Sequence, residues 1–143
     1  GKNGDSGLNR ASADREMADF VLAIARHARV DRHRPAFAVF PQNGEALARF
    51  ADYLSAVDGI GREDVFFDGN KRQKGRDVDW ATRYLDQFKK AGKLVLTIDY
   101  PTRQPLIDED YQRSLAKGYV PYDTVRDLDR LVINKGHEPT SGR

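Results

Sequence analysis

Acidic, amide and tyrosine side chains recur in this sequence directly after short apolar segments. They come in pairs: Gln42 with Asn43, Glu63 with Asp64, Asp99 with Tyr100, and Tyr122 with Asp123. A carboxyl group can move a proton or attack an electrophile, an amide can donate to and accept from hydroxyl groups, and a tyrosine ring offers a stacking face. Glu63 lies between apolar Ile60 and Val65 in the chain, which suits a carboxyl group that acts as an acid.

Each pair also has a structural interpretation that the residues alone leave open. Glu63 could be a solvated loop glutamate, and Asp64 could be an ordinary turn residue. Asp99 and Tyr100 could close a strand by hydrogen bonding, and Tyr122 could belong to the core. Gln42 and Asn43 could stabilise the turn before Gly44.

Composition narrows the chemistry further. The 143 residues include 24 basic and 22 acidic side chains and no cysteine, so thiolate metal sites and disulfides are excluded, and a nucleic-acid-binding excess of positive charge is missing. His27, His33 and His137 do not have the spacing of a metal site, and the basic segment 71–76 is expected to be a solvated loop. Gly59-Ile60-Gly61 is not a dinucleotide motif, because the third glycine is missing. We therefore expect no metal and no cofactor, and no apolar run is long enough to span a membrane.

Hydrophobic periodicity predicts the elements that would position the polar pairs. Helices are expected over 13–29, 45–56, 79–91 and 107–117, with a further turn or two over 124–131, and strands over 36–40, 57–61, 94–98 and 119–122. The run 36–40 is continuously apolar, as in a strand buried on both faces, and 67–76 is expected to be an exposed loop. Gly92 and Gly118 stand where helix C-terminal caps should be.

The alternation of helices and strands predicts an α/β fold with a parallel sheet and right-handed crossovers. The polar pairs then gather at the carboxyl ends of the strands, where both barrels and open sheets place their ligands. Because the chain opens with a helix and has about four strands, we expect the C-terminal half of a (β/α)₈ (TIM) barrel over 1–133 and a polar C-terminal tail over 134–143. Such a half leaves two bare sheet edges, which favour association.

Several segments carry a family resemblance. They are 40–45 (Phe-Pro-Gln-Asn-Gly-Glu), 53–54, 57–67 (Val-Asp-Gly-Ile-Gly-Arg-Glu-Asp-Val-Phe-Phe), 91–93, 98–100 and 118–122. In order and spacing they resemble strands five to eight of glycoside hydrolase family 114, the endo-α-1,4-polygalactosaminidases. The Pro-Gln-Asn-Gly and Gly-Ile-Gly-x-Glu-Asp segments are specific in combination, and the resemblance covers 13–131.

The resemblance implies an endo-acting glycoside hydrolase that cleaves α-1,4-linked galactosamine-containing polysaccharide with two carboxyl groups. Glu63 matches one of them, and the other is an aspartate upstream of this chain, so that this chain alone would be an inactive remnant. Gln42, Asn43, Asp64, Asp99, Tyr100 and Tyr122 would then contact substrate. Because such polymers lie outside the cell, the resemblance implies an extracellular or periplasmic location. The bare sheet edges imply that the missing N-terminal half or a second chain covers them.

Two alternatives remain open from the sequence. The chain could be a non-catalytic carbohydrate-binding module or truncated remnant, in which the aromatic and amide side chains hold sugar without cleaving it. It could also be a small open-sheet α/β domain that binds an unrelated ligand.

Overall fold

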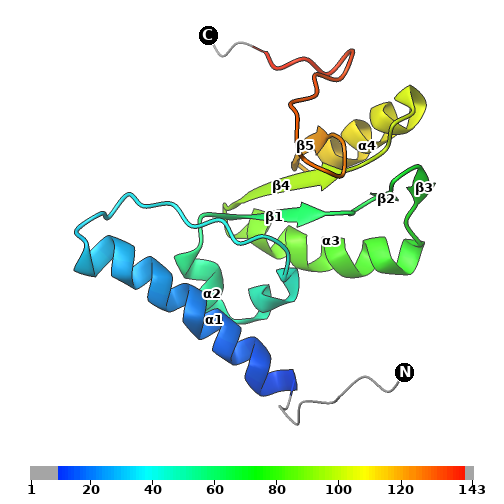
Figure 1. Cartoon of the computed structure of the whole chain (residues 1–143). Helices are drawn as coiled ribbons and strands as arrows, with labels where there is room; N and C mark the ends of the chain where they lie inside the picture. Colours follow the sequence, from blue (N-terminus) through cyan, green and yellow to red (C-terminus); the bar gives the residue numbers. More distant parts are fainter. Residues whose placement is uncertain (1–9, 141–143) are drawn as a thin grey trace.

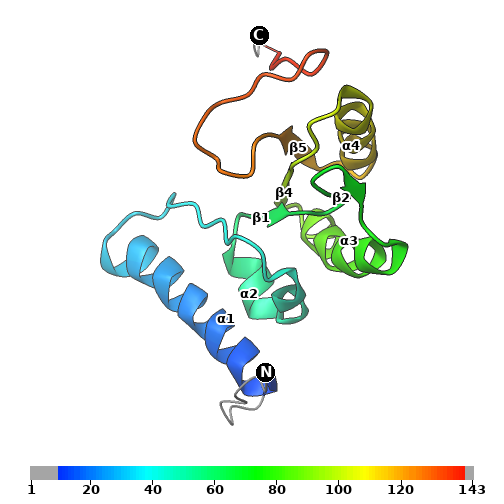
Figure 2. The same cartoon turned by 45° about the vertical axis from the view of Figure 1, so that its right-hand side comes forward.

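A three-stranded parallel sheet with helices packed along one side forms the centre of the molecule. The computed structural model describes residues 10–140. The strand order is β1 (Gly59–Glu63), β4 (Leu94–Asp99) and β5 (Val120–Asp123), joined by α3 (Gly75–Lys90) and α4 (Gln104–Ala116). Figure 1 shows α3 and α4 running beside the strands they connect, and Figure 2 shows both helices on the same side of the sheet. The expected α/β class and half-barrel architecture are confirmed by this repeated parallel β-α-β unit.

Both predicted glycine caps end a helix as expected. Gly92 has φ of +73° after α3, and the amide of Lys93 donates to the carbonyl of Phe88 at 2.9 Å. Gly118 has φ of +71° after α4, and the amide of Tyr119 donates to the carbonyl of Ser114 at 3.0 Å. A left-handed residue satisfies the last carbonyls of a helix in this way, and glycine adopts it without strain. Each cap turns the chain directly into the next strand.

The N-terminal part consists of helices beside β1. Helix α1 (Arg10–Arg26) continues into a π-helical turn (His27–Asp31), a 3₁₀-helix (Glu45–Arg49) follows, and α2 (Ala51–Ala56) precedes β1. The single helix expected over 45–56 is therefore divided at Phe50, which has extended backbone angles of φ −90° and ψ 111°. Arg15 ties α1 to α2 through an ion pair with Asp52 at 3.0 Å.

The expected strand over 36–40, buried on both faces, does not form. Residues 36–41 belong to no strand, and Phe37 and Phe40 remain 48% and 41% exposed. The segment still runs along β1: the amides of Asp58 and Gly61 donate to the carbonyls of Val39 and Pro41, both at 2.9 Å. It has a hydrogen-bonding neighbour on only one edge in the part of the chain described, so its apolar side chains find little to pack against.

Two further expectations are corrected. The basic segment 67–76 is not wholly an exposed loop, because it contains a small antiparallel hairpin of β2 (Phe67–Asp68) and β3 (Lys71–Arg72), and Phe67 is fully buried. Residues 124–131 form turns rather than a helix. Beyond them, Asn134 is buried and donates through Nδ2 to the carbonyl of Asp123 at 2.8 Å. The boundary between 133 and 134 stays a prediction.

Strand alternation gives the sheet two different faces. Val95, Thr97 and Asp99 of β4 are buried on the helix side, where the Thr97 hydroxyl lies 3.2 Å from that of Ser114 in α4. Leu96 and Ile98 point to the opposite side and are only half-buried. We call this opposite side the open face. In a closed barrel it would line the interior.

Candidate functional site at the carboxyl ends of the strands

Glu63 ends β1 on the open face of the sheet. It is paired in register with Ile98, which is in turn paired with Tyr122, so these three residues form one row across the sheet. The Oε1 atom of Glu63 accepts a hydrogen bond from the Tyr100 hydroxyl at 2.7 Å. The Glu63 amide donates to Oδ1 of Asn43 at 3.1 Å. Three of the strand ends predicted to carry chemistry therefore meet at this glutamate.

Asn43 and Asp64 both have backbone conformations that suit tight turns. Their φ angles are +58° and +52°, a region in which asparagine and aspartate are enriched among non-glycine residues. The turn at Asn43 brings its amide side chain to the backbone of Glu63. The turn at Asp64 redirects the chain immediately after Glu63, and the Asp64 amide donates to the carbonyl of Ile98 at 3.1 Å. The two turns hold the glutamate backbone from both sides.

Tyr100 is a neutral hydrogen-bond donor to Glu63. It is 4% exposed, and burial together with its hydrogen bond to Glu63 raises the pKa of its phenol well above the usual range. The proton therefore stays on the tyrosine oxygen and points at the carboxylate of Glu63. On the ring side, the guanidinium carbon of Arg126 lies 4.3 Å from the centroid of Tyr100, within the range of a cation–π contact.

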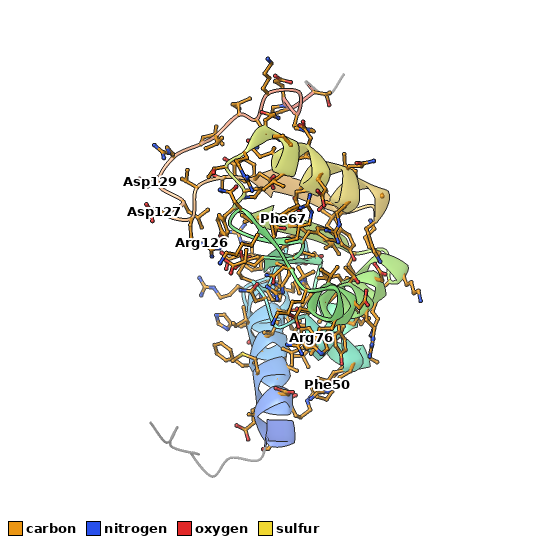
Figure 3. The ribbon with its side chains drawn as sticks, turned by 90° about the vertical axis from the view of Figure 1, so that its right-hand side faces the viewer. Phe50, Phe67, Arg76, Arg126, Asp127 and Asp129 are labelled. Carbon is orange, nitrogen blue, oxygen red and sulfur yellow. The ribbon has the colours of Figure 1, made fainter. Side chains whose placement is uncertain are left out.

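Arg126 links the segment after β5 to the acidic residues that follow Glu63. It forms ion pairs with Asp64 at 2.9 Å and with Asp68 at 3.1 Å. In the side-chain view, Arg126, Asp127 and Asp129 gather at one margin of the molecule, while Phe67 lies toward its middle (Figure 3). Asp64 is therefore engaged by a residue of this chain and would meet a substrate only alongside, or in exchange with, that guanidinium.

A second ion pair lies behind Glu63. The carboxylate of Glu45 is buried, and its Oε1 accepts a hydrogen bond from Nε of Arg62 at 2.7 Å. The same guanidinium contacts the backbone carbonyl of Glu63 through Nη1. Arg62 and Glu45 thus brace the backbone of the candidate catalytic residue from the helix side.

Asp99 lies on the helix side of the sheet rather than on the open face. Its side chain is fully buried, and both oxygens are occupied: Oδ1 accepts from the amide of Val65 at 2.7 Å, and Oδ2 accepts from Phe66 at 2.8 Å and Phe67 at 3.0 Å. Asp99 and Tyr100 are neighbours in the chain, but alternation turns them to opposite sides of the sheet. Asp99 therefore anchors the loop after Glu63, and its contact with substrate stays a prediction.

Gln42 and Tyr122 lie at the margins of the group. Gln42 bridges to Gly61 of β1, and its side-chain amide lies where a Cβ atom at Gly61 would stand. Tyr122 is half-buried on the open face, and its hydroxyl accepts a hydrogen bond from the amide of Val132 at 2.8 Å. Tyr122 thereby holds the segment after β5.

Sequence reasoning missed Arg126, Asp68, Arg62 and Glu45. The partners of Arg126 lie 62 and 58 positions away along the chain, and no local pattern marks such a contact. Glu45 was visible in the Pro-Gln-Asn-Gly-Glu segment, where its position just after a predicted strand end was a usable signal.

Within residues 10–140, no group of three or more His, Asp or Glu side chains is arranged to hold a metal ion. In the same range, none of the helices combines the length and apolarity that a bilayer crossing requires.

The curated proteins that resemble this chain are uncharacterized. No family model matches the chain. An uncharacterized protein of Methanocaldococcus jannaschii is 32% identical over 139 residues, covering 89% of this chain and 40% of the relative. An uncharacterized protein of Deinococcus radiodurans is 34% identical over 129 residues, covering 89% of this chain and 41% of the relative. The chain thus spans less than half the length of these curated relatives.

Solved structures show the same fold. The glycoside hydrolase domain of PelA from Pseudomonas aeruginosa superposes with a TM-score of 0.65 at 22% identity, over 87% of this chain and 49% of that domain. The structure of a glutamate-to-alanine variant of the same domain gives a TM-score of 0.66 at 20% identity, with the same coverage. The chain accordingly has the architecture of about half of that domain.

Proposed function

We propose that this chain is the C-terminal half of a glycoside hydrolase of family 114 type, and that Glu63 is one of its two catalytic carboxyl groups. The observation that supports this most directly is the position of Glu63. It ends β1 on the open face and accepts a 2.7 Å hydrogen bond from Tyr100, in a fold shared with a glycoside hydrolase domain. In barrel enzymes the active site is built from such strand ends.

The surroundings of Glu63 suit glycoside cleavage. In this reaction one carboxyl group protonates the leaving oxygen, while a second activates water or attacks the sugar. Tyr100 and Asn43 fix the glutamate side chain and backbone without supplying a positive charge that would hold it as a permanent ion pair. Arg62 instead pairs with Glu45, which leaves the second oxygen of Glu63 available to a substrate.

The second carboxyl group belongs to the part of the barrel outside this chain. We propose that it is an aspartate after the fourth barrel strand, as the family resemblance implies. We further propose that the substrate is an α-1,4-linked, galactosamine-containing polymer, cleaved internally, and that the protein works outside the cytoplasm, where such polymers lie. Gln42, Asn43, Tyr100 and Tyr122 are the proposed sugar contacts, since each lies at or next to the row that contains Glu63.

The test is hydrolysis of partly deacetylated galactosamine polymer by the intact protein with Glu63→Gln. The amide keeps the shape of the side chain and its bond to Tyr100 but can neither donate an acidic proton nor attack. We expect kcat to fall by roughly 10²- to 10⁴-fold, the usual contribution of such a group, with polymer binding retained. Reducing-end release measures the activity, and co-sedimentation with the polymer measures the binding.

Glu16→Gln is the matched control, because it makes the same chemical change on an exposed position of α1. It should leave both measurements unchanged. Full hydrolysis by the Glu63→Gln protein would exclude Glu63 as a catalytic group. If the unsubstituted protein binds the polymer but never cleaves it, the non-catalytic binding module is the correct function.

A further inference from the structure

Three aspartate side chains meet in the interior between the sheet and α4. They are Asp99 of β4, Asp110 of α4 and Asp123 of β5, and each is 0% exposed. Asp99 and Asp123 are register partners on adjacent strands, so their side chains leave the sheet on the same side. That side is the one on which α4 packs, and Asp110 reaches both carboxyl groups from the helix.

Donors are missing from most of this cluster. Asp99 accepts three backbone N–H groups from residues 65–67. By contrast, neither oxygen of Asp110 and neither oxygen of Asp123 accepts from an N–H or hydroxyl donor in the described range 10–140. The nearby Asn134 amide serves the Asp123 carbonyl and the Tyr111 hydroxyl, and the buried hydroxyl of Thr124 has no hydrogen-bond partner in that range.

The charged groups that act on Asp110 in the described part of the chain are acidic. The titratable groups that face it are Asp99 from β4 and Asp123 from β5, while Tyr111 is its neighbour on α4. Three buried carboxylates at such close range would repel one another and lose their hydration, and each unpaired buried ion costs several kcal/mol. A shared proton removes one charge and creates the missing donor. Burial, and after it the charge of Asp99, raises the pKa of Asp110 far above the usual range for a carboxyl group.

We propose that Asp110 carries a proton at neutral pH and, as a neutral carboxylic acid, donates it in a hydrogen bond to the carboxylates of Asp99 and Asp123. The proton stays covalently bound to Asp110, and no covalent bond forms or breaks. The acid lies beside Asp99, whose carboxyl oxygens accept the three amides of residues 65–67. Those residues follow Glu63 and Asp64 directly, so Asp110 is a positioning residue for the candidate site.

The proton on Asp110 and the loop at 65–67 would be present whatever the site binds or cleaves. Its direct consequence is an unusual dependence of stability on pH. A folded state that holds the proton more tightly than the unfolded chain is most stable at acidic pH, and it loses that advantage as pH rises above about 4, the ordinary carboxyl pKa. Asp123 acts in the same direction, since burial raises its pKa as well.

Asp110→Asn and Asp110→Ala in the intact protein separate the proposal from a merely structural role. The asparagine amide is neutral and donates, so it should replace the protonated acid: the Tm at pH 7 should stay within about 2 °C, and its decline from pH 5 to 8 should flatten. The alanine variant has no donor and leaves a cavity, so its Tm should fall by roughly 5 °C or more. Hydrogen exchange at the amides of 65–67 should accelerate in the alanine variant only.

An infrared difference spectrum between the unsubstituted protein and Asp110→Asn at pH 7 detects the proton itself. We expect a protonated-carboxyl band in the former that is lost in the latter. Asp79→Asn, on the exposed side of α3, controls for the loss of an aspartate and should show neither change. Absence of the band, or an asparagine variant that is as unstable as the alanine variant, overturns the proposal.

A bound cation is the competing explanation, since a cavity of about 180 Å³ borders Asp123 and Thr124. Melting is therefore repeated with EDTA and with millimolar Ca²⁺ or Mg²⁺. The proposal expects the same Tm in each. A Tm that rises with the cation in the unsubstituted protein and not in Asp110→Asn would show that a metal ion, rather than a proton, neutralises the cluster.

Discussion

At the scale of single residues, Tyr100 is what distinguishes Glu63 from an ordinary loop glutamate. The phenol is nearly buried, it keeps its proton, and it donates to Glu63 at 2.7 Å. A neutral donor directs the carboxyl group while leaving its proton free to move, whereas a guanidinium in the same place would hold it permanently ionised. Two guanidinium groups lie nearby, but Arg126 faces the tyrosine ring and Asp64, and Arg62 pairs with Glu45.

Tyr100→Phe tests this arrangement. Hydrogen bonds to charged groups contribute about 1.5–3 kcal/mol, so we expect activity on the galactosamine polymer to fall roughly ten- to a hundredfold. Tyr84→Phe is the control, because it removes the same hydroxyl from a tyrosine of α3. The ring of Tyr84 packs edge-to-face on Trp80, with 5.2 Å between the ring centroids. Equal activity in both variants would mean that the Tyr100 hydroxyl does not orient Glu63.

At the scale of elements, the contact between β1 and β4 depends on a glycine. A Cβ atom at Gly59 would lie 2.6 Å from the carbonyl oxygen of Leu94 and 2.3 Å from the ring of Phe40. The first neighbour is backbone and cannot rotate away. The close approach keeps β1 in register with β4, and the register in turn sets Glu63 beside Ile98.

Gly59→Ala should therefore lower the free energy of unfolding by about 1–3 kcal/mol, the usual cost of overpacking. Gly75→Ala is the matched control at the start of α3, where a Cβ atom meets nothing within 4 Å. It should be neutral or stabilise by up to about 1 kcal/mol, because alanine restricts the unfolded chain. Urea unfolding measures both, and equal stability of the two variants would contradict a close contact at Gly59.

At the scale of the whole molecule, the open face and both margins of the sheet carry exposed apolar side chains. Phe37 lies on the segment beside β1, and Val120 lies on β5, and they are 48% and 51% exposed. Phe37 also borders a hollow of about 560 Å³, whose other lining residues are Ala23, Ile24, His27, Ala28, Arg32 and Arg34. Exposed apolar surface of this kind marks an interaction site. In a barrel, further strands and helices would cover it.

The chain expressed by itself should consequently associate. We expect oligomers at micromolar concentration in size-exclusion chromatography with light scattering, and fewer of them after Phe37→Lys, since a charge at the sheet margin opposes edge pairing. Leu115→Lys is the control on α4, because it introduces the same charge at a 59% exposed helix position outside any strand. A monodisperse monomer without any substitution would contradict this prediction.

The sequence by itself determined the alternation of helices and strands from β1 to β5, but not the failure of a strand to form over 36–40, the division of the helix over 45–56 or the β2–β3 hairpin. Gly92 and Gly118 end helices because glycine takes a positive φ without strain, and the apolar run 94–98 predicts the strand that forms as β4. It also determined that polar residues would meet at one end of the sheet, because parallel strands all end on the same side. Those inferences are local, or follow from strand direction alone.

Only the tertiary structure decided which of those polar residues work together. Asp99 and Tyr100 adjoin in the chain, yet strand alternation and register turn one to the loop at 65–67 and the other to Glu63. Arg126 reaches Asp64 across 62 positions, and Asp110 meets Asp99 and Asp123 only because α4 packs on β4 and β5. Burial also depends on neighbours: the run 36–40 has the composition of an interior strand, but its side chains stay exposed where no further strand adjoins them. Register, packing and long-range pairing are properties of the assembled chain, and no local pattern contains them.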